Sequence, residues 1–125
     1  MVPGAAHTGP QGFAYALGLT RETVGATQLS LHVLTVPPGA RAKAHRHDGH
    51  ETCIYQLSGR AVTWWGDRLE HRMETGPGEM MFIPAGVPHL PTNPYPEPAV
   101  AVIARADPNG QESVVLMPEL DGLVP

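Results

Sequence analysis

The chain has 125 residues, and its 8 Lys and Arg against 12 Asp and Glu give a formal net charge of −4. That length fits one domain with a buried core, and the acidic balance argues against a nucleic-acid binder, which needs a basic surface. Cys53 is the only cysteine, so the sequence offers neither an internal disulfide nor a cysteine-based zinc site.

Signals for membranes and export are missing from the sequence. No apolar run approaches the roughly 18 residues that a membrane-spanning helix needs. The first twelve residues, MVPGAAHTGPQG, have neither the basic start nor the apolar centre of a signal peptide. We therefore expect a cytoplasmic protein with no membrane partner.

In chain order, residues 1–12 are rich in Gly, Pro and Ala and predict a loose N-terminal arm, followed by a single domain over residues 13–125. Short runs with β character follow: Leu29–Val36, Ala42–His47, Thr52–Leu57, Ala61–Trp65, Met80–Ile83, Val100–Ala104 and Ser113–Met117. Turn sequences rich in Gly and Pro separate these runs. Short strands at regular spacing predict an all-β sandwich or barrel.

Two later segments have sequences that do not predict a strand. Six prolines occur between Pro84 and Pro98, and such a segment predicts neither a helix nor a central strand. Pro118–Leu123 is the only segment in which we expect a helical turn.

A His-x-His pair lies in the second of these runs. Residues two apart in a strand point to the same face, so Lys43, His45 and His47 share one face. Imidazole is the commonest protein ligand for transition metals. On these residues alone, a ligand pair and a solvated edge strand are equally good interpretations.

Two blocks of sequence extend this pattern. The first block places Gly39, His45, His47, Glu51 and Gly59 in the order G-x5-H-x-H-x3-E-x7-G. The block resembles the first motif of the cupin superfamily, which has six residues before its last glycine.

The second block places Gly78, Pro84, Gly86, His89 and Asn93 in the order G-x5-P-x-G-x2-H-x3-N. This block matches every fixed position of the second cupin motif. The chain as a whole is similar to small single-domain RmlC-like bacterial cupins. The resemblance implies a conical β-barrel, or double-stranded β-helix of the jelly-roll type, as a single cupin domain over residues 13–125.

The resemblance also implies one divalent transition metal, which would be Fe, Mn, Zn or Ni, held by His45, His47, Glu51 and His89. The fourth ligand stays open, because seven residues separate Glu51 from Gly59 where the family has six. A β-bulge after Glu51 would turn its carboxylate to the metal. Otherwise His50 could replace it, or the three histidines could bind the metal with water.

Three further residues are candidates for substrate binding. Lys43 shares a face with His45 and could bind a substrate carboxylate, although such a lysine is more often solvated. Gln56 is a polar residue in an apolar strand and could orient a ligand or make a plain cross-strand hydrogen bond. Trp64 could line the pocket, but Trp64 and Trp65 both have packing as their ordinary role.

These residues predict a metal-dependent cupin enzyme that acts on a small organic molecule. The reaction would be that of a dioxygenase, or of an isomerase, cyclase or lyase that uses the metal as a Lewis acid. The alternative is a non-catalytic cupin module that binds a metal or a small molecule. Similarity to other cupins, and the need to cover exposed sheet edges, also predict a homodimer.

Overall fold

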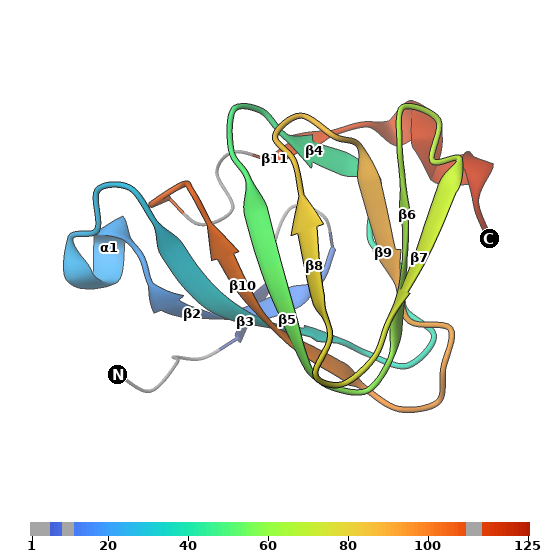
Figure 1. The fold of residues 1–125 in the computed structure, drawn as a ribbon, viewed down its shortest axis with the longest axis horizontal. Coiled ribbons are helices and arrows are strands. Elements are labelled where there is room, and N and C mark those ends of the chain that lie inside the picture. Colours follow the sequence, from blue (N-terminus) through green and yellow to red (C-terminus); the bar gives the residue numbers. More distant parts are fainter. Residues whose placement is uncertain (1–5, 9–11, 110–113) are drawn as a thin grey trace.

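The computed structural model describes residues 6–8, 12–109 and 114–125, and these form two antiparallel β-sheets (Figure 1). The first sheet contains, in spatial order, β1 (Ala6–Thr8), β2 (Ala14–Leu19), β3 (Ser30–Val36), β10 (Ala99–Arg105), β5 (Thr52–Ser58) and β8 (Met80–Ile83). The second contains β11 (Val114–Leu116), β4 (His45–His47), β9 (His89–Thr92), β6 (Ala61–Trp65) and β7 (His71–Thr75). Helix α1 (Arg21–Val24) links β2 to β3, and the 3-10 helix η1 (Pro118–Leu123) follows β11.

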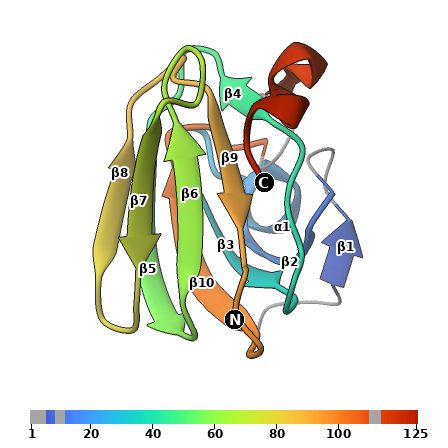
Figure 2. The ribbon, with the colours of Figure 1, turned by 90° about the vertical axis from the view of Figure 1, so that its right-hand side faces the viewer.

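The two sheets face each other around an apolar interior, as a jelly roll requires (Figure 2). Alternation along β10 explains how the interior forms: Ala99, Ala101, Ile103 and Arg105 are buried, whereas the residues between them are not. The predicted all-β fold is therefore confirmed. No helix in the described ranges is long and apolar enough to cross a membrane.

Two apolar clusters stabilise the fold. The cluster between the sheets has six buried residues, which are Phe13, Leu34, Val36, Ala42, Ala99 and Ile103.

 The second cluster lies on the outer face of the second sheet, under the C-terminal segment, and consists of Ala44, Leu69, Leu90, Leu120 and Val124. The strand that carries the His-x-His pair therefore has packed side chains on both of its faces.

Two features of Gly59, at the end of the first motif, require a glycine: its backbone conformation and the closeness of neighbouring backbone. Its φ is +69°, and a Cβ at this position would lie 2.1 Å from the carbonyl oxygen of Pro98. Gly78 also has a positive φ, +83°, but nothing lies within 4 Å of the place where its Cβ would be. Both positions would strain an alanine backbone, but only Gly59 would also give a steric clash, so comparing the two substitutions separates these effects.

We predict that Gly59→Ala lowers the free energy of unfolding by about 3 kcal/mol or more, because strain and a clash with backbone add. Gly78→Ala, the matched control, should cost only about 1 kcal/mol. Urea denaturation of the two variants measures both values. Equal losses for the two variants would show that the contact with Pro98 is unimportant.

The prediction for the proline-rich segment is wrong, because β9 lies inside it and between β4 and β6. Pro91 is part of this central strand. It pairs with Thr63 in β6, and its carbonyl oxygen accepts a hydrogen bond from the Ala42 N–H at 2.9 Å. The strand tolerates proline because the segment before β4 needs only the carbonyl of Pro91 and no N–H donor.

The N-terminal segment also differs in part from the prediction of a loose arm over residues 1–12. Ala6–Thr8 forms β1, which pairs with β2 at the edge of the first sheet. Residues 1–5 and 9–11 lie outside the described residues, so the division into an arm and a domain over residues 13–125 stays a prediction. The expected strand Ser113–Met117 corresponds to β11, with Ser113 outside the described residues.

Candidate metal site

Three buried histidines from two neighbouring strands meet at one point of the second sheet. His45 and His47 project from the same face of β4, and His45 pairs directly with His89 of β9. Each histidine offers one ring nitrogen, and these three nitrogens lie within 4.8 Å of one another. The motif spacing therefore brings together the three histidines that the sequence predicted.

Backbone carbonyl groups orient two of the three imidazoles. His45 Nδ1 donates to the Lys43 carbonyl oxygen at 2.7 Å, and His89 Nδ1 donates to the Val87 carbonyl oxygen at 2.9 Å. These bonds fix the tautomer, so Nε2 of each ring is the nitrogen with a lone pair. A histidine that binds a metal needs such a lone pair on the nitrogen that faces the metal.

The three rings are held in the neutral form, which is the form that binds metals. Burial lowers the pKa of His45 to about 4. Burial, with a further effect of the Arg105 charge, lowers the pKa of His47 to about 2. Burial also places the pKa of His89 well below its ordinary value. Three neutral imidazoles at this spacing are positioned to hold a metal ion.

The C-terminal segment supports β4 from behind (Figure 2). Ala44, directly before β4, is fully buried in the outer cluster beneath Leu120. Its N–H donates to Asp121 Oδ1 at 2.6 Å, and its carbonyl oxygen accepts from the Met117 N–H at 2.9 Å. The segment that follows β11 therefore fixes the backbone at the start of the His-x-His strand.

We predict that Leu120→Ala lowers the free energy of unfolding by about 2–4 kcal/mol, since it leaves a cavity behind β4. It should also weaken metal binding, because β4 loses its support. Leu123→Ala is the matched control: Leu123 is 44% exposed, and its loss should cost less than about 1 kcal/mol. Thermal melts and metal titrations of both variants measure these effects, and equal effects would contradict the assigned support.

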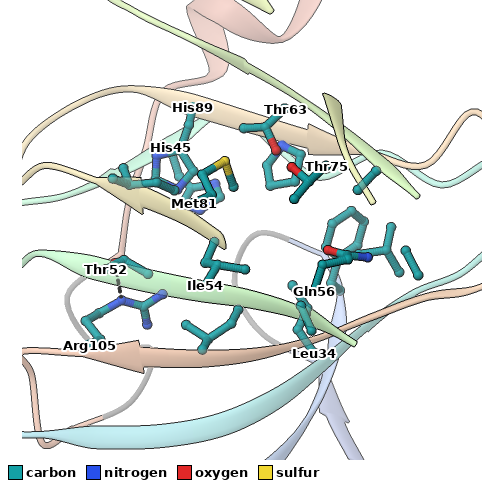
Figure 3. Close-up of a pocket in the computed structure, with 18 residues that line it drawn as sticks. Leu34, His45, Thr52, Ile54, Gln56, Thr63, Thr75, Met81, His89 and Arg105 are labelled. Carbon is teal, nitrogen blue, oxygen red and sulfur yellow. Dashed lines mark hydrogen bonds between the residues drawn. The ribbon is translucent and has the colours of Figure 1, made fainter. Parts of the chain in front are cut away.

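A small cavity of about 50 Å³ lies between the sheets beside the histidines (Figure 3). His45 and His89 form part of its wall, and most of the remaining wall is apolar. The polar side chains that line it are Thr52, Gln56, Thr63, Thr75 and Arg105. Among the described residues, the buried hydroxyl of Thr75 has no hydrogen-bond partner, so a ligand could supply one.

Neither candidate for the fourth ligand joins the three histidines. The Glu51 side chain is exposed, and its neighbour Thr52 is the residue that faces the cavity. His50 Nδ1 instead donates to the Ala106 carbonyl oxygen at 2.6 Å. A register shift does occur in β5, at Leu57 opposite Val100 and Ala101, and Glu51 stays exposed with this shift present. Of the described His, Cys, Asp and Glu residues, only the three histidines form such a group.

Of the three candidates for substrate binding, one lines the cavity and two do not. Gln56 is buried, lines the cavity and donates from Nε2 to the Ser58 carbonyl oxygen at 3.0 Å. Lys43 is exposed and is not part of the cavity wall. Trp64 packs against the outer cluster on the far face of the sheet, with the Arg72 guanidinium 5.9 Å from its ring. Its strand neighbour Thr63 lines the cavity instead.

Arg105 is a cavity residue that the sequence reasoning missed. It ends β10, is only 5% exposed, and donates from Nε to Thr52 Oγ1 at 3.0 Å. The predicted strand stopped at Ala104, one residue too early. Alternation from Ala101 through Ile103 would have placed Arg105 on the inner face, and this was the available signal.

Comparison with known families agrees with the fold. The sequence profile of the cupin domain matches residues 32–104, which is more than half of the chain. The chain therefore belongs to the cupin family. No curated protein sequence matches it.

Solved structures show the same fold at low sequence identity. A protein with a double-stranded β-helix domain from Klebsiella pneumoniae superposes with a TM-score of 0.69 at 20% identity, over 83% of each chain. The oxalate decarboxylase of Bacillus subtilis gives 0.72 at 19% identity, over 94% of this chain and 30% of the decarboxylase. The DMSP lyase of Ruegeria pomeroyi gives 0.69 at 24% identity, over 84% of this chain and 51% of the lyase.

Proposed function

We propose that this chain is a metal-dependent cupin enzyme that acts on a small organic molecule. One observation carries the proposal: His45, His47 and His89 converge on one point, and two of them line a cavity. Three protein ligands leave positions at the metal for a substrate, as catalytic sites require. The enzyme names of two similar structures, an oxalate decarboxylase and a DMSP lyase, agree with this class.

The side chains of the site have separate tasks in this proposal. The three imidazoles would hold Fe, Mn, Zn or Ni, and the carbonyl oxygens of Lys43 and Val87 keep two of them oriented. Such a metal supplies Lewis acidity, and Fe or Mn adds redox chemistry. The apolar cavity wall excludes water from the bound substrate. Gln56 and Thr75 offer it polar contacts.

The fourth position at the metal is open to water or substrate in this proposal, because the Glu51 side chain is exposed. The proposal therefore uses three histidines, in place of the predicted four-ligand set of His45, His47, Glu51 and His89 or its variant with His50. With histidines alone as ligands, zinc and nickel suit the site as well as iron and manganese do.

Activity with defined metals tests this function. Untagged protein is freed of metal, loaded with Fe(II), Mn(II), Zn(II) or Ni(II), and incubated with a panel of small organic acids, aldehydes and sugars. We expect turnover with at least one metal, and its loss in His89→Ala. Turnover that stops without O2 indicates an oxygenase, whereas turnover that continues indicates an isomerase, cyclase or lyase. Equal turnover in wild type and His89→Ala would refute the proposal.

The second candidate is a non-catalytic module that binds a metal or a small molecule. The size of the cavity, about 50 Å³, favours it, because such a cavity admits only a very small ligand. Saturable ligand binding without turnover under any metal would select this candidate over the enzyme.

We also propose a homodimer that forms through the outer face of the first sheet. Strands β5, β8 and β10 turn uncharged side chains outward there, among them Tyr55, Met80 and Phe82, which are 40%, 78% and 52% exposed. Contiguous exposed apolar surface of this kind is typical of an interface. In addition, β8 is the edge strand at the border of this face, and among the described strands it pairs only with β5.

The dimer is tested by sedimentation velocity with wild type and Phe82→Lys. We expect twice the chain mass for wild type and the monomer mass for the variant, because a lysine cannot be buried there without a partner. Arg68→Lys, at an exposed loop outside this face, is the control and should stay dimeric. A monomeric wild type would contradict the proposal.

A further inference from the structure

The cavity between the sheets has a far end, formed by Thr75 and Gln56, that lies away from the histidines. Figure 3 shows these two residues at one end of the cavity and His89 at the other. In the second sheet, His89 pairs with Trp65 of β6. Thr75 pairs with Ala61, four residues earlier on β6, and four residues of a strand span about 13 Å. The two ends are therefore separate binding positions within one cavity.

The hydroxyl group of Thr75 is a buried polar group that the fold itself does not use. Thr75 is 3% exposed and lines the cavity, and its Oγ1 makes no hydrogen bond with any described residue. Buried hydroxyl groups nearly always have a partner, because burial without one is unfavourable. Thr92, a second buried threonine of the same sheet, follows this rule and donates to the Val62 carbonyl oxygen at 2.8 Å. The Thr75 hydroxyl is therefore suited to bind a ligand in the cavity.

Gln56 adds a hydrogen-bond acceptor to the far end. It is 3% exposed and lines the cavity from the first sheet, on the wall opposite Thr75 (Figure 3). Its Nε2 donates to the Ser58 carbonyl oxygen at 3.0 Å. The side-chain amide has donors at one end and an acceptor at the other, so this bond leaves Oε1 as the atom that Gln56 offers to a ligand. The far end thus combines a hydroxyl that can donate with a carbonyl oxygen that accepts.

The far end contains no charged side chain. Of the described residues that line the cavity, only Arg105, His45 and His89 are titratable, and all three lie at the other end (Figure 3). A charged group of a ligand at the far end would be buried without a counter-charge, which is unfavourable. The group that binds there is therefore uncharged.

We infer that the far end binds the hydroxyl group of a small aliphatic alcohol, which accepts a hydrogen bond from Thr75 and donates one to Gln56. The inference rests on the proposed function, since the alcohol would be the substrate of the enzyme. A hydroxyl both donates and accepts, whereas a ketone only accepts. Ile54 and Met81 pair in register and line the cavity beside the far end, where they suit aliphatic carbon. The volume of about 50 Å³ holds about three to five water-sized groups at roughly 10–15 Å³ each, so the alcohol is short.

NMR titration of zinc-loaded, untagged protein with 2-propanol tests the alcohol site. Acetone is the matched probe, because it has the same carbon skeleton and accepts hydrogen bonds but donates none. The backbone amide signals of residues 54–56 and 61–63 report binding. We expect 2-propanol to shift these signals saturably, and acetone to bind at least about 3-fold more weakly because Gln56 Oε1 then has no donor. Equal dissociation constants for the two probes, or no saturable shift with 2-propanol, would overturn the inference.

Thr75→Val keeps the shape of the side chain and removes the hydroxyl. The dissociation constant of 2-propanol should rise about 3- to 10-fold, and the melting temperature should not fall, because the lost hydroxyl has no partner among the described residues. Thr92→Val is the matched control: it loses the bond to Val62, so its melting temperature should fall while 2-propanol binds as in wild type. Unchanged binding in Thr75→Val, or a melting temperature that falls as far as in Thr92→Val, would overturn the inference.

Zinc content, measured first, separates this inference from the proposed function. If wild type takes up zinc and does not bind 2-propanol, the inference fails and the metal site stands. If wild type takes up no zinc, the proposed function fails. The titration is then repeated on the metal-free chain, because neither Thr75 nor Gln56 is a proposed metal ligand. Binding of 2-propanol that depends on Thr75 would still support the alcohol site, and its absence would overturn it.

Discussion

His47→Ala is expected to weaken metal binding by more than about 100-fold. Loss of a residue that only orients a ligand already weakens metal binding by about 10- to 100-fold, and His47 is one of the three proposed ligands among the described residues. Neither candidate for a fourth ligand replaces the lost imidazole, because Glu51 is exposed and His50 is directed to the carbonyl of Ala106. Competition with a chelating indicator dye measures the dissociation constant.

The neighbouring residues provide the matched controls for His47→Ala. His50→Ala and Glu51→Ala, measured separately, should bind the metal as wild type does, because neither side chain joins the three histidines. If Glu51→Ala instead loses the metal, the fourth ligand is its carboxylate, and the three-histidine site is wrong. If His47→Ala binds as wild type does, the site lies elsewhere.

The metal-free protein should lose stability between pH 7.5 and pH 5.0. Burial lowers the pKa of His32 and of His45 from 6.5 to about 4, so these rings stay neutral in the folded chain. The unfolded chain takes up protons once the pH falls below about 6.5, and this uptake lowers its free energy relative to that of the folded chain. Each ring should contribute a loss of about 2 kcal/mol at pH 5.0, and the loss continues down to about pH 4.

Urea denaturation in the presence of a chelator, at both pH values, measures this loss. His32→Gln should show a difference between the two pH values that is smaller by about 2 kcal/mol. His71→Gln is the control, since His71 is exposed on β7, and its difference should equal that of wild type. A wild-type free energy of unfolding that stays constant from pH 7.5 to 5.0 would show that the buried rings are not held neutral.

The fold and the three histidines were predictable because both depend on local regularities. Alternation in β4 fixes the common face of His45 and His47, and this needs no knowledge of distant contacts. The contact of His45 with His89 joins two separate blocks of sequence. The family resemblance then supplied the pairing of the two blocks.

The remaining parts of the site depend on contacts that the sequence does not state. Thr52 lines the cavity and Glu51 is exposed, and the sequence does not state which of these two neighbours faces inward. The C-terminal segment decides that Trp64 packs in an outer cluster, because Leu120 and Val124 cover that face of the sheet. Arg105 was not predicted as a cavity residue, because a charged residue at the end of a strand is usually exposed to solvent.

Anomalous X-ray diffraction from crystals of the metal-loaded protein, recorded at the absorption edge of the metal, tests the three-histidine site most directly. The structure predicts one strong peak per chain, within bonding distance of His45, His47 and His89. A crystal that shows no peak there, or one at His50 or Glu51 instead, would contradict the site on which the proposed function depends.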